Sequence, residues 1–67
     1  MNALLAIIRC LNYHPWSSID DVAKRTKLIP DFVKKMIHSE VDYERKTEGK
    51  GKDKITLYRL KEHKTES

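Results

Sequence analysis

The sequence has little of what cross-links or anchors many small proteins. One cysteine, Cys10, stands among 67 residues, so no disulfide can form within the chain, and we expect a reducing compartment, the cytoplasm. No apolar run approaches the roughly 18 residues that a membrane span requires, so we expect no membrane association. Residues 3–11 are mostly apolar, but no basic segment precedes them and no small-residue cleavage site follows, which argues against a signal peptide.

The sequence also lacks the patterns that catalysis or a bound cofactor would require. It has two glycines and no glycine-rich phosphate loop, and Ser17 and Ser18 are typical of helix caps rather than nucleophiles. His14, His38 and His63 lie in different segments without metal-ligand spacing. A chain of this length leaves little room for a closed pocket. We therefore expect neither an enzyme nor a cofactor or metal site.

What the sequence does contain is an excess of positive charge over a modest apolar fraction. Fourteen lysines and arginines stand against ten acidic residues, which gives a net charge of +4, and 39% of the residues are apolar. This composition supports one small core, so we expect a single domain over residues 1–60 and a polar, flexible tail over residues 61–67. The positive charge favours polyanionic partners.

Helical periodicity and end signals predict three helices, at about residues 2–13, 19–26 and 30–39. Pro15 ends the first helix, Ser18 can cap the second, and Pro30 suits the first position of the third. The first helix is apolar on nearly every side, which is typical of a helix buried on more than one face.

The pattern changes to period two after residue 40. Residues 41–45 and 55–60 predict two strands, and residues 47–53, with two glycines and four charges, predict the loop of a hairpin. If Tyr58 faces the helices, Ile55 and Leu57 face outward and mark an interface. The expected fold class is mainly α with a β-hairpin: three helices followed by two strands.

Four aromatic residues are interpreted as parts of the core. Trp16 is expected to pack on the helical core, and Phe32 is assigned to the inner face of the third helix. Tyr43 and Tyr58 are also expected to be core residues before they are base-stacking residues.

This layout resembles the winged helix-turn-helix family over residues 2–60. Val22 and Ala23 match the apolar and small positions of the first helix of the motif, and Leu28 matches the apolar residue after the turn. Val33 and Met36 match the inner positions of the second helix.

One position departs from that family in a way that geometry can test. Lys27 stands where the family has a turn glycine, so either this lysine adopts a left-handed backbone conformation or the turn differs.

The resemblance implies a transcriptional regulator whose third helix enters the major groove of double-stranded DNA while the hairpin, the wing, touches the backbone. The third helix has no arginine, asparagine or glutamine for bidentate base reading, so charge would supply much of the affinity. Together with the basic hairpin, the resemblance predicts these DNA-contacting residues: Lys27, Pro30, Asp31, Lys34, Lys35, His38, Arg45, Lys46, Lys50, Lys52 and Lys54.

Other partners are considered beside DNA. The apolar first helix favours a homodimer, with Leu4, Ile7, Ile8 and Leu11 as contacts; the alternative is a monomer whose first helix is covered by the hairpin. The same fold can also serve as a protein-interaction module that docks through the outward face of residues 55–57 or the corner at residues 29–31. RNA binding by the basic hairpin is a third possibility.

Overall fold

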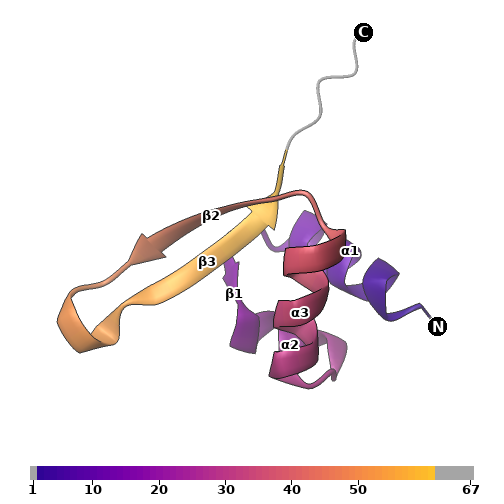
Figure 1. The fold of residues 1–67 in the computed structure, drawn as a ribbon, viewed down its shortest axis with the longest axis horizontal. Coiled ribbons are helices and arrows are strands. Elements are labelled where there is room, and N and C mark those ends of the chain that lie inside the picture. The colour runs from indigo at the N-terminus through magenta and orange to yellow at the C-terminus, as the bar shows by residue number, and fades with distance from the viewer. Residues whose placement is uncertain (1, 62–67) are drawn as a thin grey trace, which may run out of the picture.

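Three α-helices and a three-stranded antiparallel sheet make up residues 2–61, the part of the chain that our computed structural model describes (Figure 1). The elements follow one another as α1 (Ala3–Tyr13), β1 (Ser17–Ser18), α2 (Ile19–Thr26), α3 (Pro30–Glu40), β2 (Tyr43–Glu48), the short 3-10 turn η1 (Gly51–Asp53) and β3 (Ile55–Leu60). Of the predicted tail, only Lys61 lies within the described residues. None of the helices in residues 2–61 is long and apolar enough to cross a membrane.

The helix predictions are confirmed to within one residue at each end, because local signals set those ends. The Asn2 side chain accepts a hydrogen bond from the Leu4 amide at 2.9 Å and begins α1. Ser18 Oγ accepts one from the Asp21 amide at 3.1 Å and begins α2. Pro30 occupies the start of α3, where its missing N–H would have no intrahelical partner.

The turn between α2 and α3 uses a lysine in a left-handed conformation. Lys27 has φ 60° and ψ 33°, and its amide donates to the Ala23 carbonyl, which ends α2. The first of the two expected outcomes at this position is therefore the observed one: the turn keeps its geometry without a glycine.

The sheet contains a strand that the sequence analysis missed. Ser17 pairs with Tyr58 and Ser18 with Leu57, so β1 adds to β3 on the side opposite β2, and the strand order is β1-β3-β2. The predicted class, mainly α with a two-stranded hairpin, is thus corrected to α+β with three strands. A strand of two serines has neither the alternation nor the β-branched residues by which a strand is recognised in a sequence.

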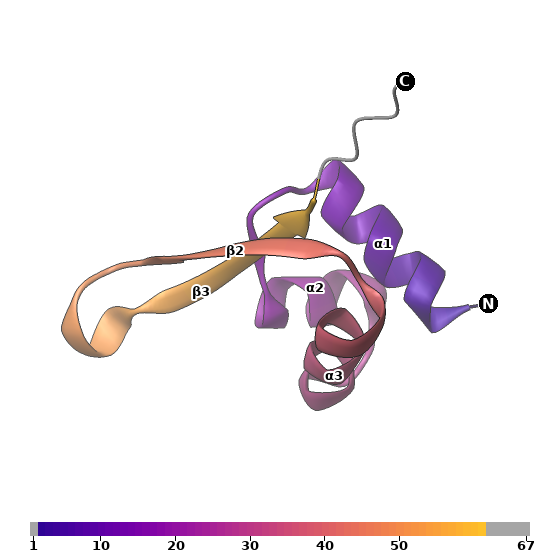
Figure 2. The same ribbon diagram turned by 45° about the horizontal axis from the view of Figure 1, so that its top comes forward.

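The core lies where the three helices meet the base of the hairpin, which projects away from them (Figure 2). Phe32 is an exception to its predicted inner position, since it is 40% exposed. The buried residues come from all three helices and β3: Ile7, Cys10, Leu11, Val22, Ala23, Val33, Ile37 and Tyr58.

Replacing Lys27 by glycine should stabilise the domain. The left-handed conformation costs a lysine about 1 kcal/mol or more, and part of that gain is offset by the greater freedom of glycine in the unfolded chain. We expect Lys27→Gly to raise the free energy of unfolding in urea by roughly 0.5–1 kcal/mol. The matched change Lys24→Gly, within α2, should lower it by about 1 kcal/mol. A loss of stability in both variants would contradict the assigned turn.

Candidate nucleic-acid interface

A cluster of three aromatic side chains joins α3 to the hairpin. His38 lies on α3, Tyr43 on β2 and Tyr58 on β3. The His38 Nε2 atom lies 3.2 Å from the Tyr58 hydroxyl, and the Tyr43 hydroxyl lies 3.3 Å from His38 Nδ1. The three ring centroids are 5.2–5.8 Å apart in tilted or edge-on arrangements, which is the favourable range for aromatic pairs.

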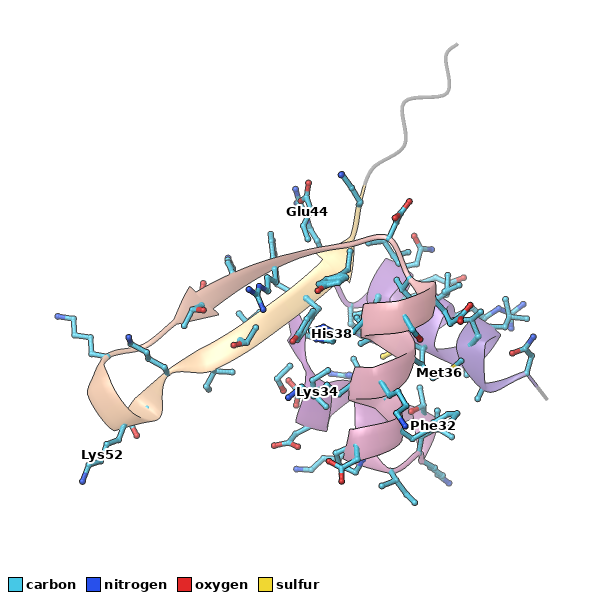
Figure 3. The ribbon with its side chains drawn as sticks, viewed as in Figure 1. Phe32, Lys34, Met36, His38, Glu44 and Lys52 are labelled. Atoms are coloured by element: carbon cyan, nitrogen blue, oxygen red, sulfur yellow. The ribbon has the colours of Figure 1, made fainter. Side chains whose placement is uncertain are left out.

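The cluster occupies both ring nitrogens of His38. A neutral imidazole has one donor and one acceptor, and here each faces a tyrosine hydroxyl, which can serve in either role. A direct contact between His38 and a phosphate would therefore require one of these hydrogen bonds to break. His38, which was predicted to contact DNA, is exposed and lies between α3 and the hairpin, next to the two tyrosines (Figure 3).

The strand register divides the hairpin side chains between two faces. Arg45 lies opposite Tyr58, and Thr47 lies opposite Thr56, so these side chains share the face that looks toward the helices. Lys46 lies opposite Leu57 and therefore belongs to the other face, which we call the back of the sheet. Neighbouring basic residues on β2 thus point in opposite directions.

Trp16 covers the back of the sheet rather than the helical core. Its ring lies 4.5 Å from Lys46 Nζ and 4.7 Å from the Arg59 guanidinium carbon. Arg59 also pairs with Glu44 at 2.7 Å, and Lys46 with Glu48 at 3.0 Å. The sequence-based placement of Trp16 is wrong because it did not include β1, which turns the chain across β3 directly after this residue.

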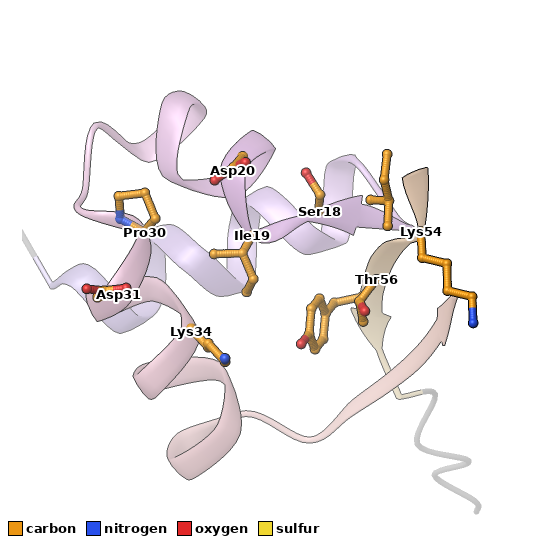
Figure 4. Close-up of a pocket in the computed structure, with 10 residues that line it drawn as sticks. Ser18, Ile19, Asp20, Pro30, Asp31, Lys34, Lys54 and Thr56 are labelled. Carbon is orange, nitrogen blue, oxygen red and sulfur yellow. The ribbon is translucent and has the colours of Figure 1, made fainter. Parts of the chain in front are cut away.

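An open hollow of about 440 Å³ lies between α3 and β3 (Figure 4). Lys34 reaches into it from α3, and Thr56 and Lys54 line its opposite side. Two carboxylates, Asp20 and Asp31, line the end of the hollow formed by the starts of α2 and α3. In residues 2–61, no group of three His, Cys, Asp or Glu side chains is arranged to hold a metal ion.

The far end of the hairpin is a tight turn that exposes lysines. Gly49 has φ 99°, and a Cβ atom there would overlap the Asp53 carbonyl oxygen, so the turn requires glycine. The Asp53 amide donates to the Lys50 carbonyl at 3.1 Å and closes the turn. Lys50 and Lys52 are exposed on it, and Figure 3 shows Lys52 at the outermost point of the hairpin.

The structure brings together some of the predicted DNA-contacting residues and separates others. Lys46 lies on the back of the sheet, Lys27 in the turn before α3, and Lys35 is exposed on α3. Those that line the hollow, share its face of the hairpin or lie at the hairpin tip are Pro30, Asp31, Lys34, Arg45, Lys50, Lys52 and Lys54.

Of the four residues of α1 predicted as dimer contacts, two are buried in the core and two are partly accessible. Ile7 and Leu11 are 0% and 1% exposed and belong to the chain's own core. Leu4 and Ile8 are half-buried, and their neighbour Leu5 is 48% exposed.

Comparison with known proteins gives no match: no protein-family model matches the chain, and neither does any curated protein or solved structure.

The contribution of the hydrogen bond between Tyr58 and His38 to stability can be tested directly. Tyr58→Phe removes the partner of His38 Nε2, so we expect the free energy of unfolding to fall by about 1 kcal/mol. Tyr13→Phe is the matched control, because Tyr13 is 74% exposed and no hydrogen bond links its hydroxyl to another residue of the described chain. Urea unfolding measures both. Equal effects of the two changes would mean that the Tyr58–His38 bond contributes nothing.

Proposed function

We propose that the protein is a cytoplasmic regulator that binds double-stranded DNA as a winged helix-turn-helix domain, with α3 in the major groove and the hairpin as the wing. One observation carries the proposal. Lys34 on α3 and Lys54 on the helix-facing side of the hairpin both line the same hollow, on opposite sides of it, with the Lys54 side chain at its outer edge. The hollow itself has two lysines and two aspartates, and the excess of positive charge comes from Arg45, Lys50 and Lys52 on the hairpin beside it. A concave surface flanked by such residues suits the phosphate backbone beside a groove.

The order of the elements supports the winged-helix assignment. A short strand lies between α1 and α2, α2 and α3 are joined by a tight turn, and two further strands form a hairpin that pairs with the first strand. This order is the one that winged helix-turn-helix domains have. The left-handed turn at Lys27 serves the same purpose as the glycine that the family uses there.

The charge of the proposed interface predicts how it would bind. It comprises five basic residues, Lys34, Arg45, Lys50, Lys52 and Lys54, and three acidic ones, Asp20, Asp31 and Asp53. Phosphate contacts would supply most of the affinity, and base reading would be limited to residues such as Asp31, which can accept from a cytosine amino group.

The salt dependence of binding to a duplex tests the proposal. Each phosphate contact contributes about −0.9 to the slope of log affinity against log salt, so five contacts would give a slope of roughly −4 to −5. Removing one contact by Lys34→Gln or Arg45→Gln should weaken binding and bring the slope about 0.9 nearer zero. Fluorescence anisotropy of a labelled duplex at several salt concentrations measures both quantities.

Lys46→Gln is the matched control within the same hairpin. It removes the same charge from the back of the sheet, where Lys46 pairs with Glu48 and covers Trp16, so the slope should not change. Absence of binding at low salt, a flat slope, or an equal change of slope in all three variants would refute the proposed interface. The same titration with an RNA duplex decides between the two nucleic acids.

Exposed apolar residues favour a second function, docking on a partner protein. Ile29 is 69% exposed and Ile55 53% exposed, at the corner before α3 and at the start of β3. Surfaces of this kind are more common at protein interfaces than on the rest of a small domain. A protein that binds no duplex, yet keeps one stoichiometric protein partner after nuclease treatment, would support this function instead.

We also propose that the protein binds DNA as a homodimer through α1. With Ile7 and Leu11 enclosed in the core, the contacts would come from Leu4, Leu5 and Ile8. Sedimentation equilibrium should show a dimer that Leu5→Glu shifts to monomer, because the change places a charge in an apolar contact. Asn12→Glu, an equal charge change at an exposed position of α1, should leave the dimer intact. A monomeric wild-type protein at micromolar concentrations would refute it.

A further inference from the structure

A second hollow, of about 520 Å³, lies between α1 and α2. The residues that line it are Ala6, Arg9, Cys10, Tyr13, His14 and Arg25, and none of them belongs to α3 or to the sheet. Figure 2 shows α1 at the end of the molecule away from the hairpin tip. The hollow is therefore separate from the proposed DNA interface.

One face of α1 forms the floor and one wall of this hollow. Ala6, Arg9, Cys10 and Tyr13 follow the i, i+3, i+4, i+7 spacing of a single helical face. Cys10 is nearly enclosed, and burial raises the pKa of its thiol, so it is a neutral, apolar part of the floor. Tyr13 is a wall that is 74% exposed, with much of its ring open to a ligand.

Two arginines flank that apolar floor. Arg9 on α1 and Arg25 on α2 are both exposed, and neither forms an ion pair or a side-chain hydrogen bond with another residue of the described chain. Arg25 lies close enough to Cys10 to lower the pKa of its thiol, and Asp21, one turn earlier on α2, acts in the opposite direction. Among the described residues that line the hollow, two are arginines and none is an aspartate or glutamate, so its lining is positively charged.

We propose that this hollow, the α1–α2 groove, binds a small organic carboxylate with an apolar body about the size of benzoate. Its volume falls within the roughly 300–1,000 Å³ range of small-molecule sites. Arg9 and Arg25 supply planar donors that match a carboxylate, Ala6 and Cys10 receive the apolar body, and Tyr13 packs against it. An inorganic anion would leave the floor uncovered, and a neutral ligand would make no use of the charge of the two guanidinium groups.

The proposal predicts a ligand preference that can be measured without knowing the natural ligand. Benzoate, benzamide and acetate are titrated into the full chain labelled with ¹⁵N, because benzamide keeps the ring without the charge and acetate keeps the charge without the ring. Benzoate should cause saturable shifts centred on the amides of residues 6–14 and 25. The two analogues should bind at least tenfold more weakly.

Matched charge variants locate the site. Arg9→Gln and Arg25→Gln should each weaken benzoate binding about fivefold or more, because each removes one charged donor. Lys24→Gln removes the same charge from the neighbouring position of α2, outside the groove, and should leave the affinity unchanged. The spectra of the free variants test whether each remains folded.

Three results would overturn the proposal: shifts that do not saturate, benzamide or acetate binding as tightly as benzoate, or an equal loss of affinity in the Lys24 and arginine variants. None of the altered arginines belongs to the proposed DNA interface. Failure here would therefore leave duplex binding to be judged on its own titration.

Discussion

The link between His38 and the two tyrosines is the interaction on which the arrangement of α3 and the hairpin depends. α3 and β2 are joined by residues 41–42, where Val41 packs on the core and the Asp42 carbonyl accepts from the Lys61 amide at 3.0 Å; other contacts also hold α3 against the hairpin. The imidazole does so by meeting a hydroxyl from each strand, with the three rings in mutual contact. Because Lys34 precedes His38 by one helical turn, the same link sets where its charge lies relative to the hairpin.

The hairpin is held from its back as well as from its helix-facing side. β1 adds two residues of pairing to β3, and the residue before β1, Trp16, takes a left-handed conformation that lays its ring under Lys46 and Arg59. The base of the hairpin is thus enclosed between an aromatic cluster on one side and a single indole on the other. Lys46 is used in this support, which leaves Arg45 as the basic residue of β2 on the helix-facing side.

Local signals predicted the helices well, whereas contacts between distant segments were not visible in the sequence. Caps and prolines set the helix ends. The absence of a turn glycine indicated that Lys27 either has a left-handed backbone or lies in a different turn, and the structure shows the left-handed backbone. β1 has too few residues for a periodic pattern, so the sequence predicted neither its pairing with β3 nor the position of Trp16 on the back of the sheet. Helical spacing assigned His38 to an outer face, but its partner Tyr58 is twenty residues away, and no local pattern reports such a pairing.

The short length of β1 has a mechanical consequence. Its pairing ends at Leu57, so the part of the hairpin beyond that residue is a ribbon of two strands, exposed on most of its surface. Two-stranded ribbons twist more readily than wider sheets. Within the described chain, β1 pairs with this one only at its base. A small rotation at the base of the hairpin, within the range that its hydrogen bonds tolerate, therefore causes a larger displacement at the tip. The lysines at the tip can in this way change position while the helical core stays unchanged.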